Sequence, residues 1–152
     1  CRGGHADIVK ICIGWGAADW DWGLRTACVG GHVDIVHQML RLGANPEYSI
    51  GSACMSGSVD IVNMLIDAGA TNFEEGLWNA CIENHTAIID MMIQLGAKRW
   101  EGALQGACAG GHVDLVKRFL PLVDPKTGVD AAMERARRSG FPKIVEMLNV
   151  YI

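Results

Sequence analysis

The chain has 152 residues and a mass of 16.4 kDa, which is enough for one domain of ordinary size with a hydrophobic core. Half of its residues are hydrophobic and the mean hydropathy is +0.18, which excludes a disordered chain that cannot offset its ordering entropy. The net charge of -4 supplies no general basic field, so nucleic acid is disfavoured as the main partner. The chain has no apolar stretch of the roughly 18–20 residues that span a bilayer and no signal-peptide pattern, so we expect a soluble protein without a membrane partner.

A heptapeptide recurs along the whole chain. It reads Gly-Gly-His-Ala-Asp-Ile-Val at 3–9, Gly-Gly-His-Val-Asp-Ile-Val at 30–36 and Gly-Gly-His-Val-Asp-Leu-Val at 110–116. Weaker copies start at positions 56, 83 and 139, which gives a period of about 27 residues. Cutting after each Gly-Ala pair predicts a single array over 1–152, with a partial first repeat and these boundaries: 1–17, 18–44, 45–70, 71–97, 98–124 and 125–152.

Each repeat predicts two helices, which we call helix A and helix B. In the repeat 18–44, Leu24, Ala27 and Cys28 share one helical face before a Gly-Gly pair, which predicts a helix A of about two turns. The broad apolar face over 33–40 predicts a helix B of about ten residues, which Gly43 ends. Because one such pair cannot bury its own apolar face, neighbouring repeats must stack, and the fold class is predicted to be an all-α solenoid.

The recurring pattern resembles a known repeat family. Residues 27–44 read Ala-Cys-x-Gly-Gly-His-Val-Asp-Ile-Val-x-x-Met-Leu-x-x-Gly-Ala, which is similar to the second half of the ankyrin repeat, Ala-Ala-x-x-Gly-His-x-x-(Ile/Val)-Val-x-x-Leu-Leu-x-x-Gly-Ala. The usual Thr-Pro-Leu-His opening is replaced at 22–25 by Trp-Gly-Leu-Arg, and the period falls short of the usual length of about 33 residues. The missing residues belong to the connection that normally forms a β-hairpin, so the resemblance implies short loops with little or no strand. Compressed repeats of this style are similar to those of large DNA viruses and some microbes.

The recurring polar and sulfur-containing residues are interpreted as structural. Five cysteines share a helix A position at which ankyrin repeats generally have alanine, and we expect them to be small, reduced core residues: Cys1, Cys28, Cys54, Cys81 and Cys108. Reduced thiols indicate an intracellular location, the cytoplasm or the host-cell cytoplasm for a viral chain. The histidines at 5, 32, 85 and 112 and the aspartates at 7, 34, 60 and 114 recur in the same way, which favours turn and helix-dipole roles. With no phosphate-binding loop and no catalytic or zinc motif, we expect no cofactor, no metal and no enzymatic activity.

Aromatic residues divide into two groups. Trp20, Phe73 and Trp100 recur at one position, with Pro46 and Val129 at that position in two other repeats, and we expect them to pack along the loop edge. Trp22, Tyr48 and Trp78 do not follow this pattern and are candidates for an individual function. In ankyrin arrays the concave surface of helix A binds proteins, so the resemblance implies that residues following the cysteine position face a groove. The candidate partner-binding residues are Trp22, Val29, Tyr48, Met55, Trp78, Ile82 and Arg138.

The leading functional hypothesis is a scaffold that binds a protein partner. Val29, Met55 and Ile82 would form an exposed apolar stripe, or alternatively would pack helix A against its neighbour. The alternative function is a structural spacer or a self-associating segment of a longer protein. In the last repeat Arg137 replaces the core cysteine, as a capping repeat requires. We expect further repeats or domains before residue 1, because the first repeat lacks most of helix A.

Overall fold

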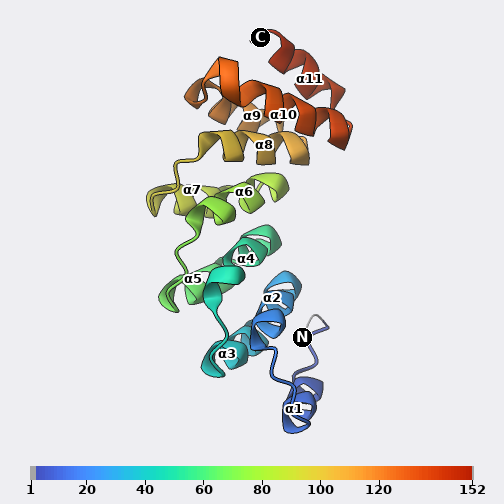
Figure 1. The fold of residues 1–152 in the computed structure, drawn as a ribbon, viewed down its shortest axis with the longest axis vertical. Helices are drawn as coiled ribbons and strands as arrows, with labels where there is room; N and C mark the ends of the chain where they lie inside the picture. Colours follow the sequence, from blue (N-terminus) through green and yellow to red (C-terminus); the bar gives the residue numbers. More distant parts are fainter. Residues whose placement is uncertain (1–2, 152) are drawn as a thin grey trace. The chain divides into compact units, whose positions relative to one another are not determined.

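A computed structural model describes residues 3–151, except for the side chains of residues 125–127. Over residues 3–151 the secondary structure is helical throughout, with no strand, which confirms the all-α prediction. The prediction that Cys1 is a core residue lies outside the described residues. The helices form two compact units, Cys1–Asn72 and Phe73–Ile152 (Figure 1). The prediction of a single array over 1–152 stays a prediction.

In the first unit, each complete repeat is a pair of antiparallel helices joined by a tight glycine turn. Helix α2 packs against α3 and α4, and α5 packs against α4 and α3. Helices A therefore contact helices A, and helices B contact helices B. The elements are α1 (Ala6–Gly14), α2 (Trp20–Gly30), α3 (Val33–Arg41), the 3-10 helix η1 (Pro46–Tyr48), α4 (Ile50–Ser56) and α5 (Val59–Asp67).

The second unit repeats this arrangement. Helix α8 packs between α6 and α10, while α7, α9 and α11 each pack on the helix A that precedes them in the chain. The elements are α6 (Phe73–Glu83), α7 (Thr86–Gln94), α8 (Trp100–Gly110), α9 (Val113–Phe119), the 3-10 helix η2 (Leu120–Leu122), α10 (Pro125–Ser139) and α11 (Pro142–Asn149).

The predicted core positions are buried. Leu24, Ala27 and Cys28 are completely inaccessible to solvent, as are their equivalents in the next three repeats. This confirms that four of the recurring cysteines are core residues: Cys28, Cys54, Cys81 and Cys108. Burial raises the pKa of Cys28, Cys81 and Cys108 to about 12, although the nearby charge of Arg118 opposes this at Cys81. These thiols therefore stay protonated and unreactive at neutral pH.

Helix A is longer than predicted in three repeats. Helices α2, α6 and α8 have 11 residues each, which is three turns, because they begin at Trp20, Phe73 and Trp100. The expectation that these aromatic residues lie in the loop is therefore wrong. The Trp100 ring stacks on Phe119 of its own helix B, with ring centroids 6.2 Å apart. The Trp100 side chain thus connects the first residue of helix A to the last residue of helix B within one repeat.

Acidic side chains at or just before the start of helix A bind the short connections between repeats. Asp21 Oδ1 accepts a hydrogen bond of 2.7 Å from Asn45 N, and Glu47 Oε2 accepts one of 2.7 Å from Thr71 N. In the second unit the Glu74 carboxylate accepts from the backbone of both residues 98 and 99, at 2.8 and 2.9 Å. Each acid therefore binds the chain about one period further on, in the short connection that follows helix B.

The turn histidine makes a second contact between repeats. Nε2 of His112, the residue before α9, lies 2.7 Å from the carbonyl oxygen of Ile82, at the end of α6. Gly110 makes this approach possible, because a Cβ atom there would overlap the same carbonyl and the imidazole ring. The position of His112 agrees with the predicted role of the recurring histidines in the turn.

Candidate functional site

Four of the predicted partner-binding residues are exposed on the first unit. Trp22 and Val29 lie on α2 with 61% and 42% of their surface accessible, whereas Tyr48 in η1 is 66% and Met55 on α4 is 39% accessible. Val29 and Met55 are therefore partly exposed, whereas Ile82, the third residue of the predicted stripe, is half-buried, and the choice between an exposed stripe and helix packing stays open. We call these four residues the α2–α4 patch.

The patch occupies one face of its helices because of the helical period. Trp22 and Val29 are seven residues apart, close to two turns, so their side chains leave α2 on the same side. Leu24 and Cys28 fill the opposite side of α2, where they are fully buried. Because its buried face is already occupied by the repeat's own core, α2 needs no bulky apolar residue on the exposed face.

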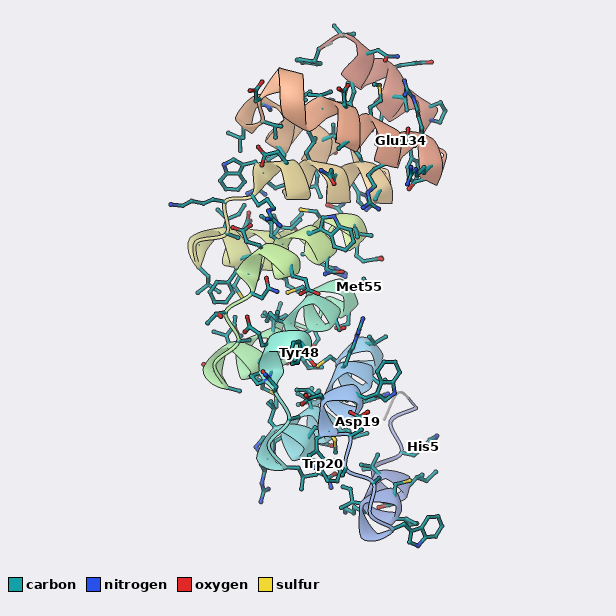
Figure 2. The ribbon with its side chains drawn as sticks, viewed as in Figure 1. His5, Asp19, Trp20, Tyr48, Met55 and Glu134 are labelled. Carbon is teal, nitrogen blue, oxygen red and sulfur yellow. The ribbon has the colours of Figure 1, made fainter. Side chains whose placement is uncertain are left out.

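Tyr48 and Met55 extend this face onto the next repeat. They occupy the positions equivalent to Trp22 and Val29, and α4 packs directly against α2. Figure 2 shows Tyr48 in the short turn before α4 and Met55 near the other end of that helix. Two exposed rings therefore lie at one end of the paired helices and two aliphatic side chains at the other. A positively charged side chain, Arg25, lies one turn after Trp22 on this face and is also exposed.

The remaining predicted residues belong to the second unit. Trp78 and Ile82 lie one turn apart on α6, and both are half-buried. The α6 backbone at these two residues is tightly packed, because a Cβ atom at Gly106 would lie 2.6 Å from the Trp78 carbonyl oxygen. Arg138 is exposed on α10, where its Nε donates a 2.8 Å hydrogen bond to Glu134 one turn earlier. The α2–α4 patch is thus made by the first unit alone.

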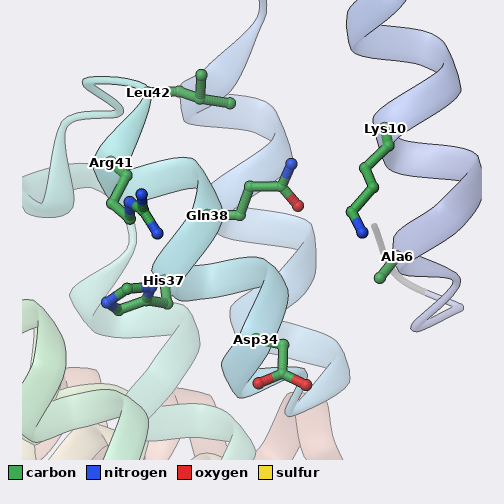
Figure 3. A pocket seen from close by; sticks show the side chains of 7 residues that line it. All are labelled: Ala6, Lys10, Asp34, His37, Gln38, Arg41 and Leu42. Atoms are coloured by element: carbon green, nitrogen blue, oxygen red, sulfur yellow. The ribbon is translucent and has the colours of Figure 1, made fainter.

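A separate cleft of about 640 Å³ lies between α1 and α3. Its polar lining includes Lys10, His37 and Arg41 together with Asp34. Figure 3 shows Lys10 and Gln38 extending toward one another across the cleft, whereas the His37 ring extends away from α1. Lys10 and His37 therefore point in different directions and do not converge on one point, as a built anion site would require.

Side chains that could bind a metal or act in catalysis take part in structural contacts instead. Over residues 3–151, no three His, Cys, Asp or Glu side chains come together in a way that could hold a metal ion. Within the same residues, every helix is too short or too polar to cross a bilayer. Some titratable side chains, Glu74 and His112 among them, are bound to backbone atoms.

Comparison with known proteins gives no family. No protein-family model matches the chain, and no curated protein is significantly similar to it in sequence.

Proposed function

We propose that this chain is a non-enzymatic helical-repeat scaffold that binds a protein partner through the α2–α4 patch. The observation that carries the proposal is the exposure of Trp22, Val29, Tyr48 and Met55 on helices whose opposite face is already buried. Large apolar side chains gathered on an exposed face are costly to keep in water and are typical of interaction surfaces.

The residue types of the patch suit protein recognition. Aromatic residues and methionine are enriched at protein interfaces, where a few of them supply most of the binding free energy. The adjacent Arg25 could pair with a carboxylate of the partner, since arginine combines an apolar stem with a planar donor group. We therefore expect a partner that presents apolar side chains beside an acidic one.

An ankyrin-like array is the proposed arrangement of the repeats. The support is the packing of α6, α8 and α10 in series and the contact of His112 with the preceding repeat. A further support is the set of bonds that Asp21, Glu47 and Glu74 make to the next connection, which we call the acidic clamp. In this proposal all six repeats stack in one solenoid. The last repeat serves as its cap because Arg137, in place of the core cysteine, is exposed on α10.

A non-enzymatic role fits the surroundings of the groups that could act in catalysis. The thiols of Cys28, Cys81 and Cys108 are kept protonated by burial, and the imidazole of His112 is engaged by a backbone carbonyl. A nucleophile needs a neighbouring base and access to a substrate. The recurring residues are committed instead to packing and to turns.

The test compares proteins captured from a lysate by the wild-type chain and by a Trp22→Ala, Tyr48→Ala double variant, with circular dichroism to show that both are folded. A matched control replaces Val33 and Val59 by alanine, because these residues are 41% and 37% accessible but lie at the start of helix B. We expect a partner that the patch variant loses and the control keeps. Identical captures from all three chains would refute the proposal and favour the spacer, whereas sedimentation that shows patch-dependent dimers would favour self-association.

A further inference from the structure

The α2–α4 patch has two apolar ends and a charged middle. On α2, Trp22 forms one end and Val29 the other, and their positions are about 10 Å apart along the helix axis. Arg25 lies between them, about 4.5 Å along the axis from Trp22 and about 6 Å from Val29. Tyr48 and Met55 repeat the two apolar ends on the next repeat, which packs against α2. The apolar side chains therefore form two pairs, Trp22 with Tyr48 and Val29 with Met55, and a positive charge lies between the pairs.

The charge of Arg25 is not compensated on this face. In the part of the chain that the structure describes, its guanidinium makes no hydrogen bond and no ion pair. The nearby acids are engaged elsewhere, because Asp21 and Glu47 both bind the backbone of the connection that follows their own repeat. At the position equivalent to Arg25, α4 has Gly51, and none of the α4 residues is charged. A carboxylate from a partner would therefore supply the missing counter-charge.

The spacing of the two apolar pairs selects a helical partner. On an α-helix, residues seven positions apart share one face and are about 10 Å apart, which matches the distance between the ends of the patch. A β-strand rises about 3.3 Å per residue, so the same distance corresponds to about three residues, and residues three apart point to opposite sides of a strand. Residues on one side of a strand are about 7 or 13 Å apart instead. A helix can therefore place an apolar side chain on both pairs, whereas an extended segment cannot.

We propose that the α2–α4 patch binds an amphipathic helix of another protein, with apolar residues seven positions apart and an Asp or Glu three or four positions after the first of them. This inference rests on the proposed function and names the partner of the same surface. The bound helix lies along α2 and α4, its two apolar side chains contact the two pairs, and its carboxylate pairs with Arg25. Recognition of the i, i+3, i+4 and i+7 face of a helix is a recurrent mode of peptide binding. Because the patch is much smaller than a stable interface of about 20–30 residues a side, we expect micromolar affinity.

The experiment is a selection from displayed peptides. A helix-forming peptide of about 18 residues is randomised at positions i, i+3, i+4 and i+7 of one face and selected on the full chain. A parallel selection uses the Arg25→Glu chain, and Arg41→Glu is the matched control because Arg41 is also exposed but lies on α3. Peptides that still bind the Trp22→Ala, Tyr48→Ala chain are discarded, so that those retained depend on the patch. Circular dichroism shows that each variant is folded.

We expect the unmodified chain and the Arg41→Glu control to select apolar residues at i and i+7 with Asp or Glu at i+3 or i+4. The Arg25→Glu chain should select Lys or Arg at i+3 or i+4 instead. In fluorescence anisotropy, alanine in place of the selected acid should weaken binding to the unmodified chain by about three- to fivefold, and should not weaken binding to the Arg25→Glu chain. A proline at i+5 should abolish binding, because it breaks the helix between the two apolar residues.

The outcomes separate this inference from the proposed function. Patch-dependent peptides that show no preference for an acid, or that tolerate the proline, would overturn the inference and leave the proposed function standing. An acid preference that survives Arg25→Glu would do the same. The absence of any patch-dependent peptide would also overturn the inference, whereas the proposed function fails separately, when the lysate capture shows no protein that depends on the patch.

Discussion

The acidic clamp between repeats can be tested by comparing two residues at the same helical position. Glu74 and Glu101 are each the second residue of a helix A, in α6 and α8. Glu74 accepts hydrogen bonds from two backbone N–H groups, at residues 98 and 99. The residue 24 positions after Glu101 is Pro125, which has no N–H to donate. Glu74→Ala therefore removes both bonds to the connection, whereas at Glu101 the bond to the first of the two equivalent backbone positions is impossible.

The size of the effect follows from the two hydrogen bonds. Each contributes about 0.5–1.5 kcal/mol net, and because these bonds are exposed to water the low end applies, so Glu74→Ala should cost about 1 kcal/mol. Glu101→Ala should stay within about 0.5 kcal/mol, as other exposed substitutions do. Both variants lose the same favourable interaction of a carboxylate with the helix dipole. The difference between them therefore isolates the bonds to the loop.

Urea denaturation of each variant, followed by circular dichroism at 222 nm, gives the free energy of unfolding. A Glu74→Gln variant adds a check, because the amide keeps one acceptor oxygen without the charge and should fall between wild type and Glu74→Ala. If Glu74→Ala and Glu101→Ala lower the stability equally, the hydrogen bonds to residues 98 and 99 contribute nothing and the clamp is not what holds the connection.

Three further predictions concern the core and the turns. Ser49→Ala should raise the free energy of unfolding by about 1 kcal/mol, because the Ser49 hydroxyl is fully buried without a hydrogen-bond partner; equilibrium urea titration measures this, and a loss of stability would contradict it. Gly110→Ala should be destabilising because its Cβ would overlap the Ile82 carbonyl, whereas Gly102→Ala would meet only the flexible Arg99 side chain and should be neutral or stabilising; thermal melts that rank them otherwise would refute the packing. Raising the pH from 9 toward 12 should lower stability, since thiols with a raised pKa stay protonated in the folded chain but ionise in the unfolded chain. An alanine triple variant should flatten this alkaline decline, and an unchanged slope would contradict it; the replaced residues are Cys28, Cys81 and Cys108.

The helices and their buried faces could be predicted from the repeat alone. A position that recurs as Leu, Ile, Leu and Leu with a constant offset to Ala and Cys has one structural environment, and these residues are indeed fully buried. The predicted start of helix A is wrong because the recurring aromatic residue is interpreted as part of the loop. A signal was present at Asp19, whose side chain caps α2 by accepting from Trp22 N at 3.1 Å. Recognition of that cap would have placed Trp20 inside the helix.

Neither the acidic clamp nor the exposure of the candidate site could be predicted from the sequence, and the reasons differ. Asp21, Glu47 and Glu74 recur visibly, but they bind backbone N–H groups, which carry no sequence signature. The period of a helix shows which side chains share a face, but not how much of that face a neighbour covers. Met55 and Ile82 occupy equivalent positions, yet the first is exposed and the second half-buried. Exposure is decided by neighbouring side chains, and these differ from repeat to repeat.

The last repeat shows how one substitution changes a connection. Pro125 cannot donate to the clamp, so the chain cannot enter helix A as it does in the earlier repeats. Proline is well suited to the first turn of a helix, and α10 begins at Pro125, four residues before the position at which α2, α6 and α8 begin. The added turn needs space, which Gly128 supplies, because a Cβ atom there would overlap the buried Val123 side chain. The helix of 15 residues that results packs on α8, and its Val129 is fully buried. A proline that removes one contact between repeats thus also starts the longer helix that replaces it, and Gly128→Ala should therefore destabilise this repeat more than an alanine at an open helical glycine.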